Sequence, residues 1–113
     1  MCVKSEQAFD LYNKAYRSEQ EGKASVAEVY YLKSSSLFEQ AGGSHYLNAA
    51  NAWNALAFLR WSYKNYAGAL RAARESMRIM ETYDHGVSNA DADLIRSTSW
   101  ELIDQINYEM SLI

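Results

Sequence analysis

The sequence contains no proline and only five glycines among 113 residues. All-β folds and long structured loops need many turn-forming residues, whereas an array of helices needs few. This scarcity therefore predicts an all-α fold. Hydrophobic residues make up 49% of the chain and charged residues 22%, as in ordinary globular proteins, and the length suits one domain that buries a core without disulfides or metals.

Cysteine and long apolar runs are also scarce. Cys2 is the only cysteine, so the sequence offers no internal disulfide and no paired thiols for a metal or a redox reaction. No apolar run approaches the ~18 residues of a membrane-spanning helix, and the first residues, MCVKSEQAF, lack the apolar core of a signal peptide. We therefore expect a cytoplasmic protein that makes no contact with a membrane.

Motifs for catalysis and for cofactor binding are missing as well. The sequence has no phosphate-binding glycine loop, no H-E-x-x-H and no G-x-S-x-G. Neither His45 nor His85 has a second histidine three or four residues away, and the aspartates near His85 are explained by helix capping. We expect no enzymatic activity, no cofactor and no metal site. The net charge of −3 argues against general nucleic-acid binding, which needs a basic surface.

Hydrophobic spacing and helix-end signals predict five helices. The predicted ranges are about 5–21, 26–41, 45–63, 66–82 and 88–111. Gly22 is expected to end the first helix, and Asn65 to cap the fourth. The third helix is apolar on most sides, so it should lie in the middle of the array. The side chains expected to open the other four helices are Ser5, Ser25, Ser44 and Ser88.

Residues of similar size recur at an interval of 42 along the chain. In the first, third and fifth predicted helices, a large residue stands four positions before a small one, and both recur at this interval. Two small residues of the second predicted helix recur in the fourth at the same interval. The recurrence predicts one domain, 1–113, with repeats at about 5–41 and 44–83 and a final helix at about 88–111. The recurring sets are Ala15, Ala57 and Ser99; Leu11, Trp53 and Ile95; Ala27 and Ala69; and Ser34 and Ser76.

The stretch 51–79 carries a spacing that is typical of one family of helical repeats. It has the pattern W-x2-L-A, followed by small residues on a second helix, at Trp53, Leu56, Ala57, Tyr66, Ala69 and Ala73. At these residues the chain resembles the tetratricopeptide repeat family, although that family has a shorter period of about 34 residues. The resemblance implies an α-solenoid of about five antiparallel helices that serves as a scaffold for protein–protein interaction. The family's glycine, its two later aromatics and its closing proline are absent here, and three of those places hold Ala57, Arg60 and Ala73.

The resemblance also implies a binding surface, because in this family the first helix of each repeat lines a concave groove. Aromatic rings there would give large contact area at low entropy cost, and asparagine amides would hold the backbone of a bound segment. The alternative is that several of these rings are core or pack against another copy of the chain. The residues implied are Tyr12, Tyr16, Asn51, Asn54, Phe58, Trp61, Arg96, Trp100 and Ile103.

Three further interpretations stay open. Arg71, Arg74 and Arg78 form a stripe that could bind an anion or a nucleic acid, although Glu75 is spaced to pair locally with Arg71 and Arg78. A helical bundle of the microtubule-interacting-and-trafficking type has a similar helix pattern, but it would leave the 42-residue recurrence unexplained. The last helix is apolar on more than one side, which favours a homo-oligomer formed through it.

Overall fold

The computed structural model describes residues 3–84 and 89–113, and five α-helices account for most of them. No strand occurs in this part of the chain, so the predicted all-α class is confirmed. The predicted helix ranges agree with the observed ones to within two residues at each end. The elements are α1 (Val3–Gln20), α2 (Ala24–Ala41), the short 3-10 helix η1 (Gly43–His45), α3 (Tyr46–Ser62), α4 (Tyr66–Tyr83) and α5 (Ala90–Ser111).

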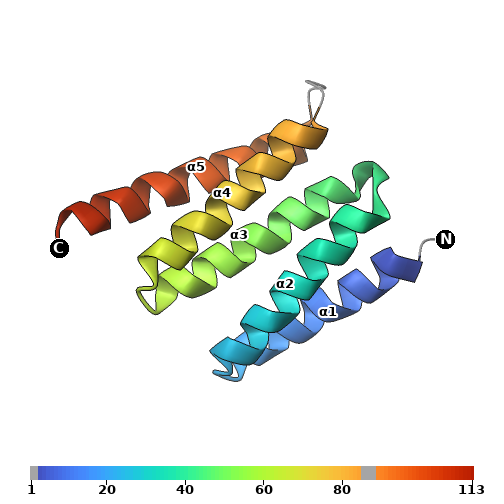
Figure 1. Ribbon diagram of the computed structural model, residues 1–113, viewed down its shortest axis with the longest axis horizontal. Helices are drawn as coiled ribbons and strands as arrows, with labels where there is room; N and C mark the ends of the chain where they lie inside the picture. Colours follow the sequence, from blue (N-terminus) through green and yellow to red (C-terminus); the bar gives the residue numbers. More distant parts are fainter. Residues whose placement is uncertain (1–2, 85–88) are drawn as a thin grey trace.

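Consecutive helices run in opposite directions, as Figure 1 shows. In this view α2 crosses in front of α1, and α4 crosses in front of α5. The molecule is flat, with extents of 47 × 35 × 18 Å, as expected for two layers of helices whose axes lie about 10 Å apart. Helix α3 packs against α2, α4 and α5, which confirms its predicted place in the middle of the array.

Small residues allow the helices to pack closely. Ala57 of α3 and Ala69 of α4 are fully buried in one core cluster, together with Ala15 and Ala27 of the first two helices. A side chain of this size lets the facing backbones approach closely, because it adds little between the helix axes. Trp53 is half-buried and packs against both core clusters of the molecule, so it connects the two halves of the interior.

The turns that join α1 to α2 and α3 to α4 have the same hydrogen bonds, 42 residues apart. In each turn, one backbone hydrogen bond joins residues five apart and a second joins residues three apart, which is the Schellman pattern found at the end of a helix. The interval found in the side chains is therefore present in the backbone too. In the α1–α2 turn, the amides of Lys23 and Gly22 donate to the carbonyls of Ser18 and Glu19, respectively (2.8 and 3.1 Å). In the α3–α4 turn, the amides of Asn65 and Lys64 donate to the carbonyls of Arg60 and Trp61, respectively (both 2.9 Å).

Burial follows the same interval. Every member of the recurring sets of small residues is fully buried, and every member of the recurring set of large residues is half-buried. Equal burial at equal spacing means that the two halves of the chain pack in similar ways. The fully buried members are Ala15, Ala57 and Ser99, then Ala27 and Ala69, then Ser34 and Ser76, and the half-buried members are Leu11, Trp53 and Ile95.

The predicted caps are only partly correct. Asn65 caps α4, since its side chain accepts a hydrogen bond of 3.1 Å from the amide of Gly68. Asn89 caps α5 by accepting bonds from the amides of residues 91 and 92, and Ser88, which was expected there, lies outside the described residues. The other three predictions are wrong, because Ser5 and Ser25 lie inside α1 and α2, and Ser44 lies within η1.

Within residues 3–84 and 89–113, no helix combines the length and the apolar content needed to cross a bilayer.

Candidate functional site

The exposed sides of α1 and α3 meet at Asn51. Its amide nitrogen donates a hydrogen bond of 3.4 Å to the hydroxyl of Tyr12, and the Tyr12 ring packs edge-on against Tyr31 with centroids 5.5 Å apart. Burial raises the pKa of Tyr12, and the hydrogen bond from Asn51 opposes that shift in part. The residue pair predicted from two separate repeats is therefore brought together, and Asn51 itself remains exposed to solvent.

Exposed aromatic rings extend this surface along α1 and α3. Tyr16 is 54% exposed and Phe58 is 42% exposed, although both are large apolar side chains. Phe58 packs edge-on against Trp61 with ring centroids 6.4 Å apart, and the Trp61 indole N–H donates a 2.6 Å bond to a carboxylate oxygen of Glu109 in α5. The indole is thus fixed in place, whereas Tyr16 and Phe58 offer uncovered ring area. We call the surface formed by Tyr12, Tyr16, Asn51 and Phe58 the aromatic face.

Hollows flank Asn51 on both sides. One, of about 360 Å³, lies between α3 and α5, and it is lined by Ser44, Leu47, Asn48, Asn51, Asp91, Leu94 and Ile95. A smaller one, of about 50 Å³, lies toward α1 and is lined by Phe9, Tyr12, Phe38, Asn48 and Asn51. Asn48 and Asn51 line both hollows, so the two amides form the ridge between them. Asn48 and Leu94 were not among the residues predicted for this surface.

Asn54 does not belong to the exposed surface. It is 3% exposed, and its amide nitrogen donates to the carbonyl of Ile95 at 3.3 Å while its oxygen accepts from the hydroxyl of Ser99 at 2.8 Å. Ser99 also lies 3.1 Å from the hydroxyl of Ser76, so the network joins α3, α4 and α5. Among the described residues, no buried side-chain nitrogen or oxygen lacks a partner. Asn54 therefore stabilises the contact of three helices, and we leave it out of the aromatic face.

None of the residues predicted from α5 lines either hollow beside Asn51. The side of α5 that lines the hollow carries Leu94, and Arg96 and Trp100 are about 200° and about 240° around the helix from it. Arg96 forms ion pairs with Asp84 and with Asp93, and Ile103 is buried in the core.

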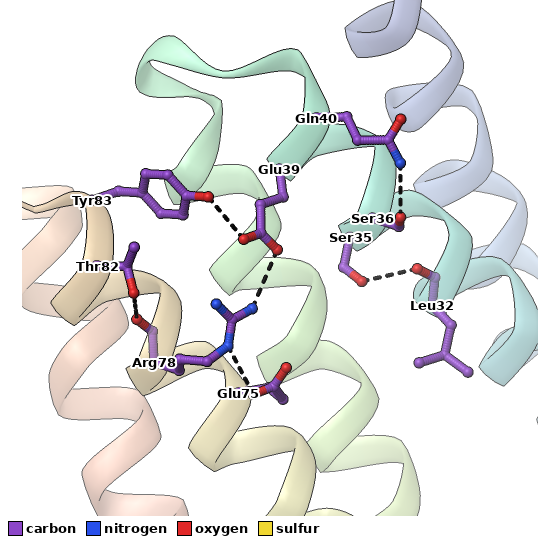
Figure 2. Close-up of polar contacts among 9 residues, drawn as sticks. All are labelled: Leu32, Ser35, Ser36, Glu39, Gln40, Glu75, Arg78, Thr82 and Tyr83. Atoms are coloured by element: carbon purple, nitrogen blue, oxygen red, sulfur yellow. Dashed lines mark hydrogen bonds and ion pairs between the residues drawn. The ribbon is translucent and has the colours of Figure 1, made fainter.

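The arginine stripe of α4 is divided by local pairing. Arg78 donates to Glu75 at 2.9 Å and to Glu39 of α2 at 3.3 Å, and Glu39 also accepts from the hydroxyl of Tyr83, as Figure 2 shows. These contacts raise the pKa of Arg78, so its charge is held by the α2–α4 interface. Within the described residues Arg71 and Arg74 form no ion pair, although Glu75 was expected to pair with Arg71 as well as with Arg78.

A larger hollow, of about 720 Å³, lies over α4, and we call it the α4 hollow. It combines apolar side chains with Arg71 and Arg74, and it was not anticipated from the sequence. Trp53 and Arg60, which also line it, are about 200° and about 180° around α3 from Asn51, so it opens away from the aromatic face. Its other lining residues are Leu32, Ala67, Leu70, Glu75 and Met110.

No group of three or more potential metal ligands is found in the described part of the chain, and His85 lies outside it. Comparison of the chain with models of protein families, with curated proteins and with solved structures finds no match.

Proposed function

We propose that the chain is a non-enzymatic protein-interaction module that binds a segment of a partner protein across the aromatic face. The observation that carries this proposal is the exposure of Tyr16 on α1 and Phe58 on α3, the two helices joined by the Tyr12–Asn51 hydrogen bond beside the two hollows. Contiguous exposed apolar area rimmed by polar groups is typical of interaction sites. The fold remains well packed without covering these rings, so their exposure has no structural explanation within the chain.

The chemistry of the face indicates the kind of segment that fits. Rings and shallow hollows accept apolar anchor side chains, and the amides of Asn48 and Asn51 both donate and accept hydrogen bonds, as the backbone of an extended segment requires. Asp91 at the rim of the α3–α5 hollow adds a negative charge. We therefore expect a segment with two apolar anchors and a neutral or basic residue between them.

We also propose that the array is a tetratricopeptide-like α-solenoid with a 42-residue period, and that it acts in the cytoplasm. The equal turns and equal burial at that interval support the first part. The resemblance at Trp53, Leu56 and Ala57 is the reason for naming this family, and the first helices of the repeats would then be α1, α3 and α5.

Selection from a random peptide library tests the function and requires no identified partner. The wild-type chain is used for selection, and the variant Tyr16→Ala with Phe58→Ala is used for counter-selection, after circular dichroism has shown that the variant is folded. The proposal predicts enriched peptides that carry two apolar anchors and bind the variant at least about tenfold more weakly, because truncating two contact rings removes about 1–2 kcal/mol or more. Enrichment of peptides that bind both proteins equally would contradict it.

A further inference from the structure

The α4 hollow carries an apolar surface that the chain does not cover. Its volume of about 720 Å³ is the largest of the hollows described above, and it lies within the range of about 300–1,000 Å³ that is usual for small-molecule sites. Its apolar lining comes from four helices: Leu32 of α2 and Met110 of α5 are 36% and 41% exposed, and Trp53 of α3 and Leu70 of α4 are half-buried. The hollow therefore offers ring and aliphatic contacts to a ligand.

Arg71 and Arg74 add two positive charges to this apolar lining. They are three residues apart on α4, so they are neighbours on one side of the helix, and both are exposed. Among the described residues, neither forms an ion pair or a hydrogen bond through its side chain. Unpaired charges also occur elsewhere on the surface, for example at Arg17, so the lack of a partner alone marks no site. Arg71 and Arg74 differ from them because both border the same apolar hollow.

The other two charged side chains that line the hollow have partners within the chain. Arg60 donates to a carboxylate oxygen of Glu28 at 2.5 Å and to the carbonyl of Gly68 at 3.1 Å. Glu75 accepts a hydrogen bond of 2.9 Å from Arg78, as Figure 2 shows. Because these two charges are balanced, the two free guanidinium groups leave the hollow with a positive charge.

This combination of side chains selects one class of ligand. Guanidinium groups bind carboxylates through paired, charge-assisted hydrogen bonds, and two neighbouring arginines can donate to the same carboxylate. The apolar side chains beside them accept a ring or an alkyl chain. The carboxylate of Glu75, which lines the same hollow, disfavours a doubly charged group such as a phosphate, because like charges repel. A singly charged organic acid with an apolar body satisfies all of these conditions.

We propose that the α4 hollow binds an amphipathic organic acid with one negative charge. Arg71 and Arg74 hold its carboxylate, and its apolar body lies against Trp53 and Leu70. Added salt weakens the binding, because the two arginines are exposed to solvent. The hollow opens away from the aromatic face, so this site does not depend on the proposed function.

Titration with the fluorescent dye anilinonaphthalene sulfonate tests the site, because the dye joins an aromatic body to a single negative charge. The arginine variant, Arg71→Ala with Arg74→Ala, removes the two charges and keeps the apolar lining. The matched control, Lys4→Ala with Arg17→Ala, makes the same change in net charge on α1. Circular dichroism first shows that each variant is folded.

Two further arms locate the dye and define the ligand. The variant Tyr16→Ala with Phe58→Ala removes exposed rings of the aromatic face, so it shows whether the dye binds there instead. Displacement of the dye from the wild type is measured with octanoate, with acetate, which lacks the apolar body, and with octanol, which lacks the charge. The displacement measurements use the wild type alone, so they do not depend on the folding of any variant.

The proposal predicts that the wild type, the α1 control and the aromatic-face variant bind the dye alike, and that the arginine variant binds it at least about tenfold more weakly. Octanoate should displace the dye at concentrations at which acetate and octanol do not. A wild type that binds no dye would overturn the proposal, as would undiminished binding by the arginine variant or equal weakening by either of the other two variants. Failure of octanoate to displace the dye would also overturn it and would leave the hollow to an acidic segment of a partner protein.

Discussion

Lys64 has the backbone conformation that glycine adopts at the corresponding turn of the first repeat. Its φ is 66°, and Gly22, 42 residues earlier, has a φ of 78°. A side chain in this left-handed region places its Cβ close to the following carbonyl, which costs about 1–2 kcal/mol. The Schellman bonds fix both turns, so the α3–α4 turn tolerates a strain that the α1–α2 turn avoids.

Replacing Lys64 by glycine is therefore expected to stabilise the protein. The gain should be about 1 kcal/mol, with a rise in melting temperature of about 4 °C, measured by thermal denaturation. The reverse change, Gly22→Ala, should destabilise by a similar amount although no atom lies within 4 Å of the added Cβ. A Lys64→Gly variant that melts below the wild type would show that the lysine side chain stabilises the turn.

Two of the three asparagines of α3, Asn51 and Asn54, are expected to have different roles, Asn51 in binding and Asn54 in stability. Asn54→Ala removes two hydrogen bonds inside a buried network, so the free energy of unfolding should fall by about 2 kcal/mol. Asn51→Ala loses one long bond at an exposed position and should cost less than about 0.5 kcal/mol. Urea denaturation of both variants measures the difference. Equal losses would mean that Asn51 is as structural as Asn54.

At the scale of the element, the start of α4 depends on two residues that fit each other. Asn65 accepts the amide hydrogen of Gly68, and a Cβ on Gly68 would lie 2.4 Å from the amide nitrogen of the Asn65 side chain. Because that distance is too short for any contact, the side chain would have to move and the cap would be lost. The three atoms nearest to that Cβ all belong to the Asn65 side chain, so the cap itself requires glycine at position 68.

A double-mutant cycle at Asn65 and Gly68 tests this coupling. Asn65→Ala should cost about 1 kcal/mol in the wild type, as expected for loss of an N-cap. In the Gly68→Ala background the same change should cost close to nothing, because the cap is already displaced. Urea denaturation of the four proteins gives the coupling energy, and additive effects would contradict the geometry.

The contact between α1 and α2 is expected to weaken in alkaline solution. Burial raises the pKa of Tyr12 and of Tyr31, and the hydrogen bond of Tyr31 to Glu19 raises the latter further. The folded state thus holds both phenols protonated, while the unfolded state releases their protons above a pH of about 10. Stability should be unchanged below that pH and should fall as the pH rises beyond it.

Denaturation curves between neutral pH and strongly alkaline pH measure this loss. The pKa is also raised at Tyr63, Tyr66 and Tyr83, but Tyr31 has a large shift. Tyr31→Phe should therefore be less stable at neutral pH but should lose less stability on going to high pH. A pH dependence that is as steep in the variant as in the wild type would show that other groups cause it.

At the scale of the whole molecule, the sequence allowed the class, the five helices and the 42-residue interval to be predicted. These features depend on local spacing and on the size of side chains such as Ala57 and Ala69, which can be read along the chain. The caps at Ser5 and Ser25 were wrong because both helices begin before these residues; at α2 the added Ala24 packs against the core, whereas at α1 the added Val3 is exposed and nothing in the structure explains the extension. Tertiary contacts override a cap when the added turn buries apolar area.

The candidate site was predictable only in part, since it depends on the rotation of each helix about its axis. Tyr12 and Asn51 lie together as expected, whereas Asn54 is buried in a network and Arg96 is held by Asp84 and Asp93. The α4 hollow could not be foreseen, because whether Arg71 pairs with Glu75 depends on Glu39 and Arg78 across the α2–α4 interface.

The central claim is that the aromatic face binds a partner segment, and calorimetric titration of one library-selected peptide tests it most directly. The peptide is titrated into the wild type, into Tyr16→Ala with Phe58→Ala, and into Arg71→Ala with Arg74→Ala as the control on the opposite face. The account predicts at least about tenfold weaker binding to the first variant and unchanged binding to the second. Unchanged binding to the first variant, or equal loss in both, would contradict it.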